Sequence, residues 1–298
     1  MEAAIVGLGR MGANMARRLQ RGAVTVHVFN RTYSKAQALE AEGLHACKTL
    51  EDLVAALSRP RSVILMLPAG APVKTHIRQF ADLLSPGDIL IDGGNSYYKD
   101  DPVHYETLRK TGIHYLDAGI SGGIWGLENG YCTMVGGDPE VFKKIEPLLA
   151  VLAPEKGYLY CGPPGSGHFV KMVHNGIEYA MMQAYAEGFN VLKSSPYGEA
   201  LSFDKISELW NNGSVIKSWL LELLGRAFAD DPSLKDLNPL VEDSGEGRWT
   251  VHQAIETGVP VPVIASSIFA RFTSQNRGDF SNRVLAALRK GFGGHVVK

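Results

Sequence analysis

The sequence predicts an α/β domain with a mostly parallel sheet, followed by an all-α domain. Three features carry this prediction: an apolar strand that runs into a glycine-rich turn and a helix, alternating strand and helix patterns through the first half, and helical patterns almost alone after residues 161–167. The chain has 298 residues, of which 45% are hydrophobic and 20% are charged. That length and composition suit one large or two ordinary globular domains.

The first predicted strand lies within residues 3–12, AAIVGLGRMG, and leads directly into a helical pattern, ANMARRLQRG. The turn has the spacing GxGxxG and consists of Gly7, Leu8, Gly9, Arg10, Met11 and Gly12. Between a strand and a helix, this spacing predicts a Rossmann-like dinucleotide-binding domain. Gly7 permits a tight turn, Gly9 lets backbone N–H groups approach a pyrophosphate, and Gly12 allows close helix–strand packing. The alternative is a glycine-rich turn that binds nothing.

The second predicted strand, VTVHVFNRT, ends in Asn30, Arg31 and Thr32. Proteins that bind NAD usually place an Asp or Glu at this point to accept hydrogen bonds from the ribose hydroxyls. Here no carboxylate repels a 2′-phosphate, and a guanidinium and a hydroxyl can bind one. NADP is therefore the predicted cofactor, with NAD as a second possibility. Alternatively, Arg31 only caps a solvated loop.

Further strands are expected near residues 61–70, 88–96 and 113–123, with helices at 49–59 and 71–84. This alternation predicts right-handed βαβ crossovers. Two of the strands end in unusual loops, Gly93-Gly94-Asn95-Ser96 and Ser121-Gly122-Gly123. Ligands of open α/β sheets bind at the carboxyl ends of the strands, so both loops are expected to face the nicotinamide. As simple turns they need no ligand.

The glycine- and proline-rich segment 161–167 predicts a domain boundary. We expect a dinucleotide-binding domain at 1–163 and a helical domain for substrate binding and oligomerisation at 164–298. The expected helices of the second domain span 167–194, 203–212, 214–230, about 247–257 and 263–290.

Charge and cysteine content restrict the function classes. The net charge of −1 gives no support for binding to nucleic acid or to an anionic membrane. Cys47, Cys132 and Cys161 lack the spacing of a metal site and are expected to be buried thiols of a reducing compartment. No segment is long and apolar enough for a bilayer, and the N-terminus lacks a signal-peptide pattern. We therefore expect a cytoplasmic protein without a metal.

The predicted helix that contains VKMVHNGIEY is unusual. Four polar residues share about a third of its circumference, at about 100° per residue: Lys171, His174, Asn175 and Glu178. Val173, Ile177 and Ala180 lie opposite and are expected to pack into the helical domain. The polar side also carries Met182 and Tyr185 and little net charge, which favours an enclosed site over a solvated face.

Together, GLGRMG, NRT, IDGGNSYYKD, ISGG, GSGHFVKMVHNGIEYAMMQAYAEG and GEGRWTV resemble the decarboxylating 6-phosphogluconate dehydrogenases, in their shorter form. The resemblance covers nearly the whole chain, and VKMVHNGIEY is its most specific part. It implies oxidation of the 3-hydroxyl of 6-phosphogluconate with NADP or NAD, followed by loss of CO2 to give ribulose 5-phosphate. It also implies a homo-oligomer, a dimer or a tetramer.

The resemblance implies two catalytic residues. Lys171 corresponds to the base that takes the hydroxyl proton and returns it to the C3 oxygen, and Glu178 to the acid that protonates C1 of the enediol. A free lysine has a pKa of about 10.4, so burial and nearby positive charge must lower that pKa. Glu178 needs a raised pKa in a dry site.

The resemblance also implies the substrate contacts. Asn95, His174 and Asn175 are expected to orient the substrate, and Ser121, Gly122 and Gly123 to hold its carboxylate end; Asn95 is also expected at the cofactor. The phosphate is expected at Tyr179, Arg248, Thr250 and Arg271. The tail residues Arg289 and His295 are expected to complete the site of a partner subunit.

Two alternatives stay open at this point. One is another β-hydroxyacid dehydrogenase, of the 3-hydroxyisobutyrate or tartronate-semialdehyde type, which shares the lysine but typically lacks the pair His174 and Glu178. The other is a non-catalytic NADP-sensing protein, which would be expected to have lost Lys171 or Glu178. Both residues are present.

Overall fold

The computed structural model describes residues 1–293, with side chains at all of these except 279 and 289–293. The chain divides into two compact units, Met1–Val173 and His174–Lys298. The division falls inside helix α8 (Ser166–Ser194), after the loop where the sequence predicted a boundary. The first two turns of α8 belong to the sheet unit because they pack on its strands, as shown below. The domain ranges 1–163 and 164–298 stay a prediction.

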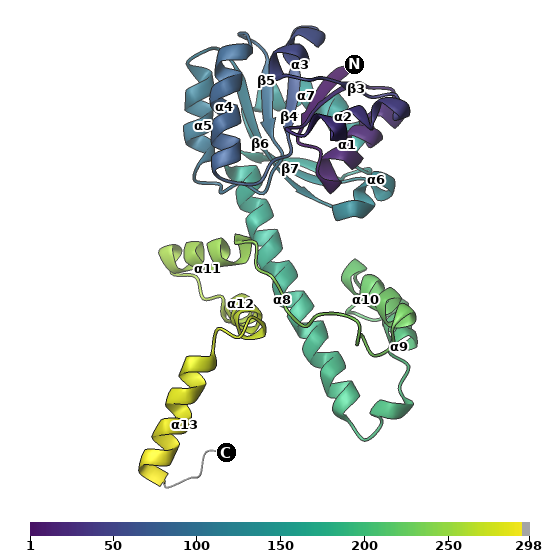
Figure 1. The fold of residues 1–298 in the computed structure, drawn as a ribbon, viewed down its shortest axis with the longest axis vertical. Coiled ribbons are helices and arrows are strands. Elements are labelled where there is room, and N and C mark those ends of the chain that lie inside the picture. Colours follow the sequence, from purple (N-terminus) through teal and green to yellow (C-terminus); the bar gives the residue numbers. More distant parts are fainter. Residues whose placement is uncertain (294–298) are drawn as a thin grey trace. The chain divides into compact units, whose positions relative to one another are not determined.

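The first unit is built on an eight-stranded sheet with the order β3-β2-β1-β4-β5-β6-β7-β8 (Figure 1). The strands are β1 (Glu2–Val6), β2 (Thr25–Phe29), β3 (His45–Ala46), β4 (Ser62–Leu65), β5 (Ile89–Asp92), β6 (His114–Ser121), β7 (Cys132–Gly137) and β8 (Tyr158–Gly162). All neighbours pair in parallel except β6 and β7, which are antiparallel. The predicted fold class, a mostly parallel sheet followed by helices, is confirmed.

Helices cover both faces of this sheet. They are α1 (Arg10–Arg21), α2 (Tyr33–Gln37), α3 (Leu50–Ala56), α4 (Ala71–Leu83), α5 (Asp101–Arg109), α6 (Gly126–Asn129) and α7 (Pro139–Leu152). Ala3 and Ile5 of β1 join a buried cluster with α1 and α7, whereas Ala4 and Val6 join a second cluster with α3, α4 and α5. Because alternate residues of a strand point to opposite faces, a strand buried on both sides is continuously apolar.

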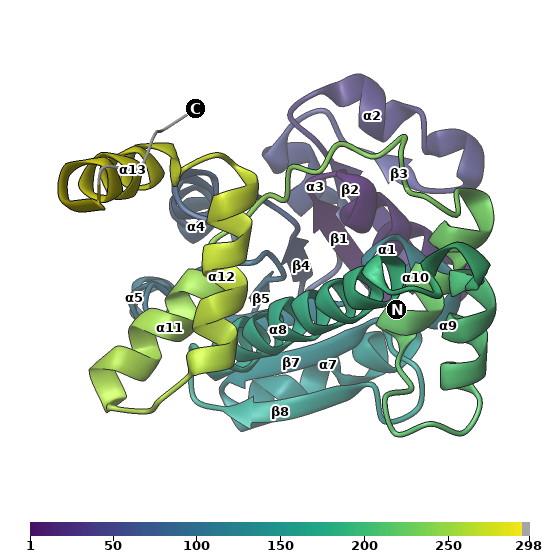
Figure 2. The same cartoon turned by 90° about the horizontal axis from the view of Figure 1, so that it is seen from below.

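The second unit is helical. After α8 it contains α9 (Phe203–Asn211), α10 (Trp219–Asp230), α11 (Glu246–Thr257), α12 (Pro262–Ser274) and α13 (Asp279–Gly293). Helices α9 and α10 pack against each other, as do α11 and α12 (Figure 2). Phe189, Leu221 and Phe228 form the buried core beside the first pair. No helix among the described residues is long and apolar enough to cross a membrane.

Two predicted helices of the second unit differ from the structure by more than one residue. The helix expected at 214–230 begins at Trp219, because the Ser218 hydroxyl accepts a hydrogen bond from Leu221 N at 3.1 Å and caps it there. The helix expected at 263–290 is two helices, α12 and α13. The break contains Asn276 with φ 57°, and Asn is one of the few residues that adopt this left-handed conformation readily.

The expectation that all three cysteines are buried is wrong for two of them. Cys47 is buried, and burial raises the pKa of its thiol. Cys132 is exposed and Cys161 is half-buried. Both lie on strands near one edge of the sheet, β7 and β8, where side chains are less covered than in the centre.

Candidate active site

The glycine-rich turn after β1 has the geometry that its spacing predicts. Gly7 has φ 99°, and a Cβ there would lie 2.4 Å from the Met66 carbonyl oxygen. A Cβ on Gly12 would lie 2.1 Å from the Gly7 carbonyl oxygen, so α1 packs tightly onto the turn. A Cβ on Gly9 would meet nothing within 4 Å. Space for a ligand is therefore open at Gly9, at the N-terminus of α1, where helix N–H groups lack intrahelical partners.

A cavity of about 460 Å³ lies beside this turn. Its lining includes Gly7, Leu8, Gly9, Asn30, Arg31 and Thr32. The Asn30 side chain joins the two loops, because its Oδ1 accepts from Leu8 N at 3.0 Å and its Nδ2 donates to Thr32 O at 3.1 Å. No carboxylate is among the described residues that line the cavity, whereas Arg31 and Lys35 supply cations. The cavity therefore lies where the glycine-rich turn and the end of β2 meet, and it carries positive charge at Arg31 and Lys35.

Two further loops follow β5 and β6. Asp92, at the end of β5, accepts from Gly94 N at 3.0 Å and from the Ser96 hydroxyl at 2.7 Å. These bonds fix the loop and leave Asn95 exposed. After β6, Gly122 and Gly123 have φ 134° and 55°, which favours glycine at both positions. Arg10, Met11, Gly12, Asn95 and the Ser121–Gly123 loop do not line the cavity described above, and their roles stay predictions.

Lys171 lies in the second turn of α8 and is only 6% exposed. A Cβ on Gly119 of β6 would lie 2.2 Å from the Lys171 Cβ, so the helix touches the strand backbone at this point. The missing side chain of Gly119 is therefore what lets Lys171 approach the sheet.

The polar face of α8 continues into the second unit. His174 Nδ1 lies 3.7 Å from Glu178 Oε2 and 3.1 Å from Asn175 Oδ1. Asn175 is buried, whereas the His174 and Glu178 side chains are 38% and 37% exposed. Glu178 is thus not in a dry site within this chain.

The opposite side of α8 differs from expectation. Ile177 is 51% exposed, and Val173 and Ala180 are half-buried. The prediction that this side packs into the helical domain is wrong for Ile177. The periodicity of the sequence identified an apolar side correctly but could not tell what, if anything, covers it.

The residues expected at the phosphate lie near one another in the second unit. The Arg271 guanidinium lies 3.6 Å from the ring centroid of Tyr179 and donates to Glu242 O at 2.7 Å. The Tyr179 hydroxyl is 3.1 Å from Ser244 Oγ. Thr250 is buried against Gly176, where an added Cβ would lie 2.9 Å from its Cγ2.

Arg248 pairs with a carboxylate of the 242–244 segment, which also contacts Arg271 and Tyr179. Its Nε lies 2.8 Å from Asp243 Oδ2, and about half of its side chain is exposed. Arg289 and His295 lie outside the residues whose side chains are described, so their expected role stays a prediction.

Sequence reasoning missed a buried polar network beneath α8. Asp101 Oδ1 accepts from the Tyr115 hydroxyl at 2.7 Å, and Asp101 Oδ2 lies 2.9 Å from His168 Nδ1. Burial raises the pKa of Asp101 to about 6, although His168 acts in the opposite direction. Burial alone lowers the pKa of His168, but the neighbouring carboxylates outweigh burial and raise it to about 10. The pair is therefore ionised near neutral pH.

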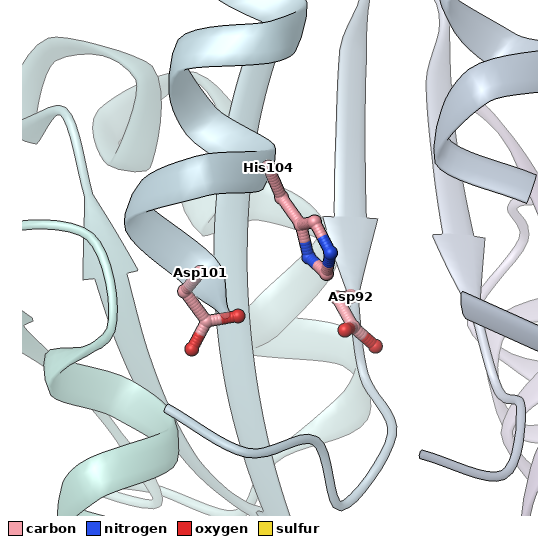
Figure 3. Close-up of side chains that lie close together, drawn as sticks. All are labelled: Asp92, Asp101 and His104. Atoms are coloured by element: carbon pink, nitrogen blue, oxygen red, sulfur yellow. The ribbon is translucent and has the colours of Figure 1, made fainter. Parts of the chain in front are cut away.

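Beside this network, His104 projects from α5 toward Asp92 at the end of β5 (Figure 3). Asp92, Asp101 and His104 have potential metal-ligand atoms within 4.8 Å of one another. The same is true of Asp101, Asp117 and His168. Both oxygens of Asp92, Asp101 and Asp117 receive hydrogen bonds from the protein, so we describe these carboxylates as parts of a hydrogen-bond network. The available signals were Asp117 inside an apolar strand and His168 in GSGHF.

Comparison with known proteins assigns both halves of the chain. The family model described as the NAD binding domain of 6-phosphogluconate dehydrogenase matches residues 2–162. The model described as the C-terminal domain of 6-phosphogluconate dehydrogenase matches residues 167–291.

Individual relatives agree. The NAD(+)-dependent, decarboxylating 6-phosphogluconate dehydrogenase of Haloferax volcanii is 39% identical over 299 residues, which cover 100% of this chain and 98% of that protein. The NADP(+)-dependent, decarboxylating 6-phosphogluconate dehydrogenase of Bacillus subtilis is 38% identical. The alignment covers 91% of this chain and 60% of that protein. The structure of Plasmodium falciparum 6-phosphogluconate dehydrogenase matches with TM-score 0.84 and 28% identity, over 100% of this chain and 66% of that one. Both halves of the fold and full-length similarity thus lead to one conclusion: the chain belongs to the 6-phosphogluconate dehydrogenase family.

Proposed function

We propose that this chain oxidises 6-phospho-D-gluconate with a nicotinamide dinucleotide and decarboxylates the product to D-ribulose 5-phosphate. The observation that carries the proposal is the order of groups on α8. Lys171 is buried against the sheet, and Glu178 follows about two turns later, beside His174. A substrate that is first deprotonated and later reprotonated needs a base and an acid in such an arrangement.

The chain's own groups supply the proton transfers. Lys171 accepts the proton of the C3 hydroxyl as the hydrogen at C3 leaves as hydride. A bound NADP or NAD supplies the acceptor for that hydride. When the C1–C2 bond of the 3-keto acid breaks and CO2 leaves, Lys171 returns its proton to the C3 oxygen. Glu178 then protonates C1 of the ribulose enediol while Lys171 takes the proton back from the former C3 oxygen, which yields the ketose.

The remaining site residues have positioning roles in this proposal. Asn95, His174 and Asn175 orient the substrate hydroxyls, and the Ser121–Gly123 loop holds the carboxylate. Arg271, held on the Tyr179 ring, and the neighbouring Thr250 support a phosphate site. Arg248 is half-exposed and singly paired with Asp243, so it can turn toward a dianion and form a charge-assisted bond.

The preferred cofactor is NADP in this proposal. Arg31 and Lys35 line the cavity without a carboxylate beside them, and relatives of either preference are similar to this chain. Arg31→Asp adds repulsion and removes a charge-assisted contact, so we expect a swing toward NAD of at least about 2 kcal/mol in kcat/KM. Arg59→Asp, an exposed arginine away from the cavity, is the control. A wild-type preference for NAD would overturn this choice.

We also infer a homo-oligomer in which Arg289 and His295 reach the partner's site, and a cytoplasmic location in keeping with three free cysteines. Mixing inactive Lys171→Ala chains with impaired Arg289→Ala chains, unfolded and refolded together, tests the first inference. Activity above that of either variant alone requires a site built from two chains.

The reaction itself is tested with purified protein, 6-phosphogluconate and either dinucleotide. We expect reduced dinucleotide and CO2 in equal amounts. Oxidation without CO2, or turnover only of 3-hydroxyisobutyrate or tartronate semialdehyde, would identify another β-hydroxyacid dehydrogenase. Binding of NADP without turnover of any of these would identify a sensing protein.

A further inference from the structure

The N-terminus of α8 is capped by a residue from a distant strand. Asp117 of β6 is fully buried; its Oδ1 accepts from Gly165 N at 2.7 Å and its Oδ2 from His168 N at 2.9 Å. Gly165 precedes the helix, and His168 is its third residue. In an ordinary capping box, side chains at these two positions satisfy each other's N–H groups. Here Gly165 has no side chain, and one carboxylate of the sheet does both tasks.

Glycines at the same place let the backbones of the helix and the sheet come into contact. A Cβ on Gly167 would lie 2.4 Å from Met134 O, and a Cβ on Gly136 would lie 2.4 Å from Asp117 Oδ1. Together with the contact between Gly119 and Lys171, these distances mean that the first two turns of α8 rest directly on the backbones of β6 and β7. These backbone contacts limit how closely the helix can approach the sheet, because backbone atoms cannot adjust as flexible side chains can.

The side chain of His168 does not cap the helix, because Asp117 already does so. It forms a second contact between the helix and the sheet unit. It pairs with Asp101 of α5, and Asp101 is held in turn by Tyr115 of β6. All three are buried. Removing one partner from a buried charge pair leaves an uncompensated charge, so this attachment resists displacement.

These attachments are in register with Lys171. Asp117 and Gly119 are two positions apart on β6 and therefore share one face of the sheet. His168 and Lys171 are three positions apart on α8 and share one side of the helix. Asp117 thus binds the helix at His168, and two residues further along the strand Gly119 contacts Lys171.

We propose that Asp117, supported by the pair of Asp101 and His168, is the positioning residue that sets where Lys171 stands for proton abstraction. The proposal rests on the proposed function, which makes Lys171 the base. Asp117 itself does not touch substrate; it acts through the helix. A misplacement of about 1 Å in a reacting group can lower a rate by about 100-fold, so a small shift of the helix start is enough.

Asp117→Asn tests this, with Asp88→Asn as the matched control. Asp88 is equally buried in the same sheet unit and also accepts from two backbone N–H groups, of Arg61 at 2.8 Å and Ser85 at 2.9 Å. It lies at the amino end of β5 and additionally pairs with the Arg61 guanidinium. The control therefore removes at least as many interactions without touching α8.

For Asp117→Asn we expect kcat to fall about 10- to 100-fold while the Kd of NADPH is unchanged. We also expect the deuterium isotope effect on kcat, measured with substrate deuterated at C3, to rise, because hydride transfer becomes rate-limiting. Asp88→Asn should keep kcat within about twofold and leave the isotope effect unchanged, although it loses stability. Equal losses of kcat in both variants, or an unchanged isotope effect in Asp117→Asn, would overturn the proposal.

Hydrogen exchange separates this proposal from the proposed function. The amides of residues 165–171 should exchange faster in Asp117→Asn than in the wild type and the control. Unchanged exchange would show that Asp117 does not anchor the helix, whatever the activity. An inactive wild type would overturn the proposed function instead. Should Asp117→Asn fail to fold, Asp101→Asn, which loosens the second attachment, must show the same isotope effect in smaller measure or the proposal falls.

Discussion

The two ends of the polar face on α8 are held in different ways. At its start, Lys171 is 6% exposed and rests on Gly119, in a helix capped by buried Asp117. About two turns later, the His174 and Glu178 side chains are 38% and 37% exposed and make a single 3.7 Å contact with each other. In the proposed roles, the base is held against the sheet, whereas the acid is more exposed and less closely held.

This difference matches the demands of the two proton transfers. Removing the hydroxyl proton must coincide with hydride transfer, so the base needs a fixed geometry before the substrate arrives. Protonating the enediol is a separate, later step, and an acid that moves with its substrate suits it. The comparison predicts that the same kind of truncation has unequal effects at the two ends.

The largest expected effect is that of Lys171→Ala. With no other base in place, turnover should fall by at least about 1,000-fold, within the range for general-base catalysis. The Kd of NADP, measured by fluorescence or calorimetry, should stay unchanged, since Lys171 belongs to the substrate side. Lys193→Ala, an exposed lysine in the last turn of the same helix, is the control. Turnover near that of the control would remove Lys171 from the mechanism.

Glu178→Gln should have a smaller effect, about 10- to 100-fold on kcat. Its side chain is more than a third exposed in this chain, so water can replace part of its acid function. The KM for substrate should change little, since the role of Glu178 comes late. A loss as large as that of Lys171→Ala would contradict the comparison and would mean that Glu178 becomes enclosed during turnover.

The sequence predicted those parts of the site that depend on local spacing. GxGxxG predicted the tight turn at Gly7 and the close packing of Gly12, and a helical period placed Lys171 and Glu178 on one side of α8. Local patterns fix such features because the relevant atoms are within a few residues of one another.

The parts that it did not predict depend on distant contacts. Asp117 and His168 are 51 positions apart. Nothing in the sequence around either residue indicates that the two are in contact. The strands β7 and β8 and helix α7 also lay outside the predicted elements. The sequence of β7, CTMVGG, is short and rich in glycine, and this strand runs antiparallel to β6. The break in the predicted helix 263–290 contains Asn276 in a left-handed conformation. Asn adopts this conformation only occasionally, so its presence in the sequence does not predict a break.

Gly119→Ala tests the contact that brings Lys171 to the sheet. The added Cβ would lie 2.2 Å from the Lys171 Cβ, so the helix must shift, and we expect kcat to fall by about tenfold or more. Gly22→Ala is matched in crowding, because its Cβ would lie 2.3 Å from a Val151 methyl group away from α8. Both variants should lose stability, but Gly22→Ala should keep kcat. Equal kcat values would mean that the sheet does not set the position of Lys171.

The prediction with the smallest expected effect on activity concerns the pH dependence of stability. The pKa of His168 is raised from 6.5 to about 10 in the folded protein. Between these values the folded chain keeps a proton that the unfolded chain releases, so the free energy of unfolding falls as pH rises through this window. The contribution is fully present below 6.5 and amounts to about 1 kcal/mol per pH unit within the window. The pKa of Asp101, raised from 3.8 to about 6, gives the same sign between those two values.

Unfolding by denaturant at several pH values between 6.5 and 10 measures this contribution. In the double variant Asp101→Asn with His168→Gln neither partner of the pair titrates, so its stability should fall less steeply with pH than that of the wild type. His252→Gln, an exposed histidine of the second unit, should leave the wild-type slope unchanged. The expected contrast follows from the neighbouring carboxylates, chiefly Asp101, which keep the proton on His168 although burial opposes it. Parallel slopes for all three proteins would mean that the pair is hydrated, and the start of α8 would then be no better held than the exposed end that carries Glu178.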